Sequence, residues 1–244
     1  MSIELWQWWV FAVGAALVGF SKSGIPGIGV LAVAIFQWFL PPKVATGLVL
    51  PLLIVGDLAA VATYRRHTDW SHLWRLFPWT AAGIVAGYAV FARIDDRAAS
   101  VLIGLILLAM LGLHVWRMRG GGEPRVHGAW FAPTVGLAAG FATLIANAAG
   151  PLMVLYLLAM GLPKLSFLGT SAVFFCVMNL FKVPFMVDLG GIDGTSLEVN
   201  VWLAPAVLAG SWLGRLAAGR VSQRRFEIAA LALTFVSAVH MIVR

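Results

Sequence analysis

Ten apolar segments alternate with short polar loops along the chain. They occupy positions 5–20, 25–40, 44–64, 75–92, 98–116, 129–145, 150–161, 165–186, 201–219 and 226–243. A helix rises about 1.5 Å per residue and needs about 20 apolar residues to cross a bilayer, so the last three segments of each half are long enough to cross. The pattern predicts an all-α, polytopic membrane protein with about 8–10 helical segments.

Helix-breaking residues interrupt the first apolar stretch at GFSKSGIPGIGV, residues 19–30. As one continuous helix, residues 5–40 would be about 54 Å long, which is more than one crossing requires. The second half has a comparable break at LIANAAGP, residues 144–151. Each break therefore predicts a hairpin of two short helices. The pattern leaves open whether each hairpin turns back inside the bilayer or crosses it twice.

The two halves share an order and spacing of residues. Pro78, Gly83, Gly87 and Arg93 are spaced like Pro205, Gly210, Gly214 and Arg220. In the breaks, Pro26 corresponds to Pro151. These ordered matches indicate a duplication, with one membrane repeat at 1–118, a cytoplasmic linker at 119–128 and a second repeat at 129–244. The glycine pairs fit close helix packing.

Loop charges suggest that the second repeat is inverted relative to the first. Each repeat, a broken hairpin plus three transmembrane helices, makes an odd number of net crossings. Loops 65–75, 117–126 and 215–225 are rich in arginine, whereas loop 187–200 has three acidic residues and no Lys or Arg. Because basic loops favour the cytoplasm, this pattern predicts two inverted-topology repeats with both termini outside.

Composition narrows the class of protein. The chain is 61% apolar and 11% charged, with a mean hydropathy of +0.93, and a soluble domain would carry roughly a quarter charged residues. The net charge is +7, and the arginines lie in short loops between apolar segments. This is the pattern that orients a protein in a membrane, so we expect no nucleic-acid partner. The single cysteine, Cys176, allows no internal disulfide.

The two breaks carry the candidate binding chemistry. We expect the second helix of each hairpin to begin at its break, capped by Ser23 or Gly24 in the first hairpin and by Asn147 in the second. Helix starts offer free N–H groups and partial positive charge, and Lys22 adds a full charge, so two converging starts predict an anion site. Structural glycines, an interfacial Lys22 and a purely capping Asn147 are the alternatives.

A few other polar residues lie within predicted spans. Asp57 is a functional candidate that pairs with Lys22, carries a coupling proton, or forms an ion pair with an arginine near the cytoplasmic end. Asn179 and Lys182 are three residues apart and share a helix face, although Lys182 has the alternative of extending to the outer interface. The predicted substrate-binding residues are Ser21, Lys22, Ser23, Gly24, Asn147, Asn179 and Lys182.

Four stretches carry a resemblance to a known family. They are VGFSKSGIPGIGVLAV (18–33), PPKVATGLVLPLLIVGDLAAVATYRRHTDW (41–70), ANAAGPLMVLYLLAMGLPKLSFLGTSAVFF (146–175) and NLFKVPF (179–185). In these stretches the chain resembles the TauE/SafE sulfite exporter family, also called the 4-toluene sulfonate uptake permease (TSUP) family. The resemblance implies a duplicated, multi-pass bacterial membrane protein that moves sulfite or organosulfonates. Together with the loop charges, it predicts the bacterial cytoplasmic (inner) membrane as the location, with both termini periplasmic.

The leading hypothesis is a secondary transporter that moves a small sulfur-containing anion by alternating access, with Asp57 as a candidate carrier of a coupling proton. A passive anion channel is the alternative. An intramembrane enzyme is disfavoured because the sequence has neither an HExxH motif nor a second deep carboxylate. The missing GxxxxGK[ST] motif disfavours ATP as the driving force within this chain. We expect no cofactor and no metal; the partners are the anion and membrane lipid, and a homodimer is left open.

Overall fold

The described part of the chain is built from helices. A computed structural model describes residues 4–26, 28–40, 42–91, 93, 95, 97–98, 101, 104–105, 108–109, 111–112 and 129–243. The helices are α1 (Leu5–Ser23), α2 (Ile28–Phe39), α3 (Pro42–Tyr64), η1 (Arg65–His67), α4 (Trp70–Phe91), α6 (Phe131–Ala146), α7 (Ala149–Ala159), α8 (Lys164–Asp188), α9 (Gly194–Arg220) and α10 (Gln223–Val243). Predicted segment 98–116 is described only in part, and the predicted linker 119–128 lies outside the described residues.

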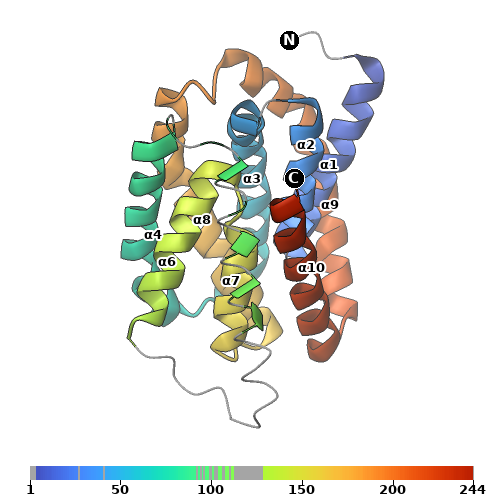
Figure 1. The fold of residues 1–244 in the computed structure, drawn as a ribbon. Coiled ribbons are helices and arrows are strands. Elements are labelled where there is room, and N and C mark those ends of the chain that lie inside the picture. Colours follow the sequence, from blue (N-terminus) through green and yellow to red (C-terminus); the bar gives the residue numbers. More distant parts are fainter. Residues whose placement is uncertain are drawn as a thin grey trace.

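Both predicted hairpins are present. The first apolar stretch is divided into α1 and α2, and the corresponding stretch of the second half is divided into α6 and α7. In Figure 1, α1 runs down from the top and α2 returns upward, whereas α6 rises from the bottom and α7 returns downward. The returning helices have 12 and 11 residues, or about 18 and 16 Å, which is too short to cross a bilayer core of about 30 Å.

The first helix of each hairpin packs along a long helix from the other half. α1 lies along α9, and α6 lies along α4. Glycines allow the backbones to approach closely: a Cβ on Gly19 would lie 2.8 Å from Ser211 N, and one on Gly140 would lie 2.8 Å from Ile84 N. Gly83 and Gly210 are equally crowded by backbone of the partner helix. The glycine pairs therefore have the packing role that their spacing predicts.

α3 and α8 cross at the centre of the molecule in opposite directions. Gly47, near the start of α3, contacts Gly191 just beyond α8, and Gly169, near the start of α8, contacts the chain just beyond α3. Apolar clusters fill the space on each side. One joins α3 to α1, α2 and α9, and the other joins it to α4, α6, α7 and α8. The polar residues described below lie between these clusters.

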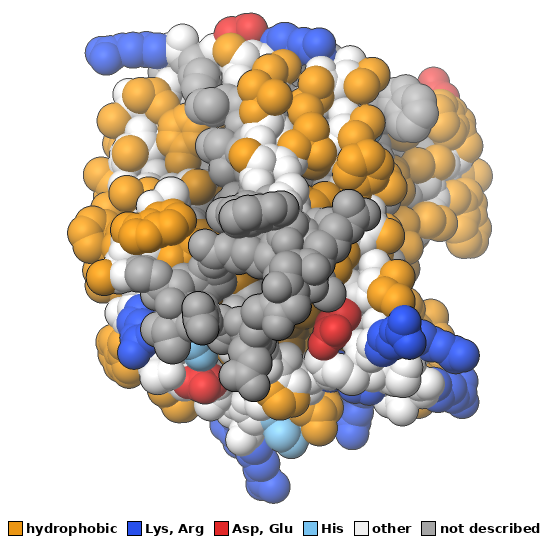
Figure 2. Space-filling view, turned by 60° about the horizontal axis from the view of Figure 1, so that its bottom comes forward, with side chains coloured by type: hydrophobic (Ala, Val, Ile, Leu, Met, Phe, Trp, Pro, Cys, Tyr) orange, Lys and Arg blue, Asp and Glu red, His pale blue; other side chains and the backbone are white. Residues whose placement is uncertain are grey.

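Three of the described helical stretches are long and apolar enough to cross a membrane: Val44–His67, Lys164–Asp188 and Gly194–Arg220. They belong to α3 with η1, to α8 and to α9. Figure 2 shows a broad apolar surface, with charged side chains toward the ends of the molecule. The arginine-containing loops after α3 and α9 lie at the bottom of Figure 1, and the acidic connection between α8 and α9 lies at the top.

Candidate functional site

The first break begins where α1 ends. Ser23 is the last residue of α1 and Gly24 is its C-cap, whereas α2 does not begin until Ile28. The prediction that Ser23 or Gly24 caps the second helix is therefore wrong, because the break is longer than the Gly/Pro pattern suggested. Tyr64 donates a hydrogen bond from its hydroxyl to the Ser23 carbonyl at 2.8 Å, which satisfies one of the free carbonyls at this helix end.

Asn147 forms the second break. Its φ of 52° lies in the left-handed region, and its own N–H donates to the Thr143 carbonyl at 3.1 Å, as in an αL helix ending. Asn147 is thus the C-cap of α6, and the prediction that it caps α7 is wrong because Ala148 occupies that position. Asparagine suits this position since it tolerates the left-handed conformation better than most residues. Pro151 lies in the first turn of α7, as predicted.

Lys22 forms an ion pair with Asp57. The distance from Lys22 Nζ to Asp57 Oδ1 is 2.8 Å, and Asn179 Nδ2 donates to the other carboxylate oxygen at 2.6 Å. The Asp57 side chain is fully buried and that of Lys22 is 11% exposed. The lysine stem passes over Gly56, where a Cβ would lie 3.2 Å from Lys22 Cγ. Of the three predicted roles of Asp57, pairing with Lys22 is confirmed.

Lys182 stabilises the second break from within the protein. It is fully buried, which contradicts the alternative of an ammonium that reaches the outer interface. Its Nζ donates to the Thr143 carbonyl at 2.8 Å and also to Asn147 Oδ1, and Asn147 Nδ2 donates to the Thr46 carbonyl at 2.9 Å. These bonds connect the end of α6 to both central helices, α3 and α8.

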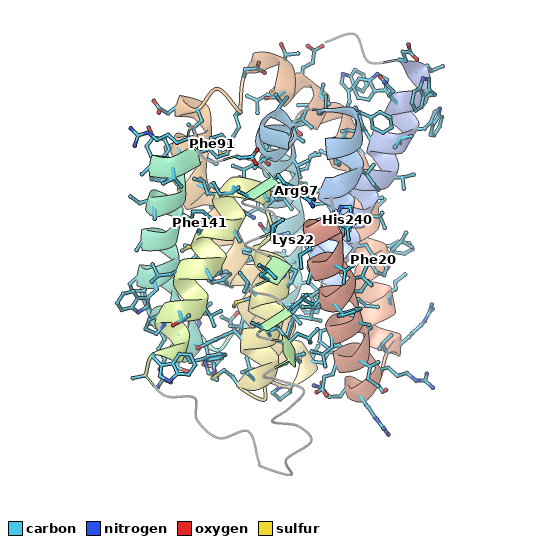
Figure 3. All side chains as sticks on the ribbon, in the orientation of Figure 1. Phe20, Lys22, Phe91, Arg97, Phe141 and His240 are labelled. Atoms are coloured by element: carbon cyan, nitrogen blue, oxygen red, sulfur yellow. The ribbon has the colours of Figure 1, made fainter. Side chains whose placement is uncertain are left out.

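A cavity of about 50 Å³ joins the two breaks. Its walls come from α1, α2, α3, α6, α7 and α8, and Lys22 lies near mid-height of the molecule in Figure 3. The polar side chains in the wall are Ser21, Lys22, Thr143, Asn147, Ser171 and Asn179. The start of α7 also faces the cavity through Gly150, where a Cβ would meet nothing within 4 Å.

The predicted site residues divide into two groups. Ser21, Lys22, Asn147 and Asn179 line the cavity. The wall does not include Ser23, Gly24, Asp57 or Lys182. Asp57 and Lys182 each bond to a wall residue from behind, whereas Ser23 and Gly24 shape the end of α1. Sequence reasoning missed Thr143 and Phe175, and the only sequence signal for them was their proximity to a predicted site residue.

The charges around the cavity favour an anion. Lys22 carries the ammonium that lines the cavity, Lys182 lies behind Asn147, and among the described residues Asp57 is the carboxylate that pairs with Lys22. Free N–H groups at the start of α7 add positive potential. No group of three or more potential metal-ligating side chains occurs in the described part of the chain. The arrangement can therefore hold a small negatively charged species close to Lys22.

A second polar cluster lies away from the cavity, beside the loop after η1. His72 Nδ1 lies 3.2 Å from the Tyr156 hydroxyl, and Asp69 N donates to Thr170 Oγ1 at 2.9 Å. The pKa of Asp69 is lowered because the Ser71 hydroxyl donates a hydrogen bond to its carboxylate. These contacts fasten the loop between α3 and α4 onto α7 and α8.

The comparisons with known proteins identify the family. No curated protein and no solved structure gave a match. The family model described as "Sulfite exporter TauE/SafE" matches residues 10–241, a range that includes both breaks and both central helices. Members of this family are transporters and not enzymes. The chain is therefore a membrane transporter of the sulfite-exporter type, and it belongs to the TauE/SafE family.

Proposed function

We propose that the protein is a secondary transporter that moves a small sulfur-containing anion, sulfite or an organosulfonate, across the bacterial cytoplasmic membrane. One observation carries this proposal. Lys22 lines a cavity at which the two hairpin breaks meet, and Asp57 and Lys182, one from each half of the chain, bond to residues of its wall from behind. When Asp57 is protonated, Lys22 has no charged partner, and because an unpaired positive charge is costly at membrane depth, the site is then suited to an anion.

Donors from both halves hold the anion. Ser21 and Lys22 come from the first hairpin, and Asn147 comes from the second. The Asn179 amide and the N-terminal amides of α7 complete the set. Asp57 and Lys182 orient these donors from behind the wall, so their effect on binding is indirect.

Asp57 couples anion binding to a proton. In its charged form it occupies Lys22 through the 2.8 Å ion pair, so a substrate anion must compete with it. Protonation of Asp57 neutralises this competitor and frees Lys22 for the anion. One proton on the carboxylate and one anion on the ammonium leave the net charge of the site unchanged, which avoids the cost of burying an extra charge.

Alternating access follows from an inverted duplication. In the proposed duplication α1 corresponds to α6 and α4 corresponds to α9. The contacts agree with this, because α1 packs on α9 and α6 packs on α4, and the two hairpins run in opposite directions. Residues 55–61, VGDLAAV, align with residues 177–183, VMNLFKV, so Asp57 and Asn179 are equivalent positions that contact each other at the centre. Inverted repeats around a central site are the architecture of many secondary transporters.

Flux measurements test the function directly. The purified protein is reconstituted into liposomes, and sulfite, sulfate and organosulfonate movement is measured with and without a pH gradient. We expect saturable sulfite flux that a proton gradient in the same direction accelerates severalfold. In Asp57→Asn, whose side chain carries no titrating proton, flux continues but no longer responds to the gradient.

The outcomes separate transporter from channel. Flux that does not saturate, and that a proton gradient never drives uphill, supports a passive anion channel instead. If none of these anions moves although the protein is inserted, the proposed function is wrong. If the flux of Asp57→Asn still responds to the proton gradient, Asp57 is not the carrier of the coupling proton, but the transporter function stands.

A further inference from the structure

The cavity contains one aromatic side chain in its described wall, Phe175 of α8. Its ring centroid lies 4.2 Å from Lys22 Nζ, so the ring faces the ammonium that we assign to the substrate. A cation–π contact of this kind holds the ammonium in place while covering one side of it. An anion bound beside Lys22 therefore shares the cavity with this ring.

The cavity is small. A cavity needs about 10–15 Å³ on this measure to hold one water molecule, so about 50 Å³ holds about four oxygen-sized atoms. Sulfite, one sulfur with three oxygens, is of this size. An organosulfonate carries a similar head together with a carbon skeleton, which needs additional volume next to the head.

The wall offers few ways to gain this volume. Most of the other apolar wall residues are glycine, proline or alanine, and their bulk is mainly backbone. Leu53 and Leu168 are the larger aliphatic exceptions, and both are at least 95% buried in the packing around α3 and α8. Phe175 is only partly buried and contacts Lys22 directly, so its ring is the bulky group nearest to a bound head.

We propose that Phe175 sets the size limit of the site, which makes the substrate a compact sulfur oxyanion such as sulfite and excludes organosulfonates with bulky skeletons. The inference rests on the proposed function and narrows its substrate class. In Phe175→Ala, the ring is replaced by open space beside Lys22, and a skeleton has room where the ring was.

Competition in liposomes tests this size limit. Sulfite flux is measured against increasing methanesulfonate, ethanesulfonate and benzenesulfonate, for the native protein, Phe175→Ala and Phe175→Leu. Phe167→Ala is the matched control, because Phe167 lies on the same helix, is buried outside the cavity wall and packs against Phe226. A change of pocket size of this kind alters discrimination by about tenfold or more.

We expect benzenesulfonate to compete poorly with the native protein and at least about tenfold better with Phe175→Ala, with Phe175→Leu in between. Phe167→Ala should discriminate like the native protein even if it is less stable. Native protein that accepts benzenesulfonate as well as sulfite overturns the size limit while leaving the transporter function intact. An equal change in both alanine variants also overturns it, because loosened packing then explains the effect. Native protein that moves no sulfur anion overturns the proposed function itself.

Discussion

Asn147 contributes to the candidate site in two ways, through its left-handed backbone conformation and through its side-chain amide. Its φ of 52° ends α6 so that the chain turns at the cavity. Its amide accepts a hydrogen bond from Lys182 and donates one to the Thr46 carbonyl. Glycine adopts the same backbone conformation without strain but lacks the amide. The two contributions of Asn147 can therefore be measured separately.

We predict that Asn147→Gly folds and inserts but loses most sulfite flux. The turn is kept, whereas Lys182 loses an acceptor and the cavity loses a donor. Asn147→Ala should be less stable than Asn147→Gly, because alanine is strained at positive φ by about 1 kcal/mol or more. Thermal unfolding in detergent and flux in liposomes give the two readouts. Native flux in Asn147→Gly would show that the amide does not contribute to the site.

The sequence pattern located both breaks because glycine and proline are conspicuous in apolar runs. It selected Lys22, Asn147 and Asn179 because polar residues are costly at membrane depth. It placed Asn147 at the wrong helix end because asparagine is favoured both at N-caps and in the left-handed C-cap conformation, and the break there is short. Phe175 was missed because an aromatic residue in an apolar helix is typical of ordinary packing until its neighbours are known.

The hairpins are held in place by their contacts with the long helices. α1 and α9, like α6 and α4, touch through glycines whose Cβ positions coincide with partner backbone. Backbone cannot yield as a flexible side chain does, so a substitution there separates the helices. Because α1 carries Lys22 and α6 leads to Asn147, the same contacts determine how far apart the two breaks lie.

We predict that Gly210→Val destabilises the protein by about 1–3 kcal/mol or more, because its side chain overlaps the Ala16 carbonyl of α1. Gly219→Val, nine residues along the same helix, is the control, since a Cβ there meets nothing within 4 Å. Thermal unfolding of both variants in the same detergent gives the comparison. Equal melting temperatures would mean that α1 and α9 do not pack at this distance.

At the scale of the whole molecule, the two halves are arranged around the α3–α8 pair. The repeated spacing of glycines and prolines in the sequence predicts which helices correspond, and that correspondence stays a prediction. It did not predict which helices touch, because the pairing of α1 with α9 joins residues nearly 200 positions apart. It also missed the contact between Asn179 and Asp57, from which we propose that the two positions are equivalent.

We predict that a reporter fused after Arg244 is periplasmic, as is one fused at the N-terminus. In Figure 1, α1 starts at the top and α10 runs upward from the bottom and ends near mid-height, whereas the arginine-containing loops after α3 and α9 lie at the bottom. Paired fusions of alkaline phosphatase and of a cytoplasm-active fluorescent protein give the readout. A C-terminal fusion that is active only in the cytoplasm would refute the inverted orientation.

The central claim is that one anion binds between the two breaks, beside Lys22. Binding of radiolabelled sulfite to the purified protein tests it most directly, with Lys22→Gln/Asp57→Asn as the site variant, since removal of both charges leaves neither buried unpaired. Lys164→Gln is the control, because Lys164 bonds to the end of α9 outside the cavity. We predict saturable binding to the native protein and to the control, and affinity at least about tenfold weaker in the double variant. Sulfite bound equally well by the double variant would contradict the account.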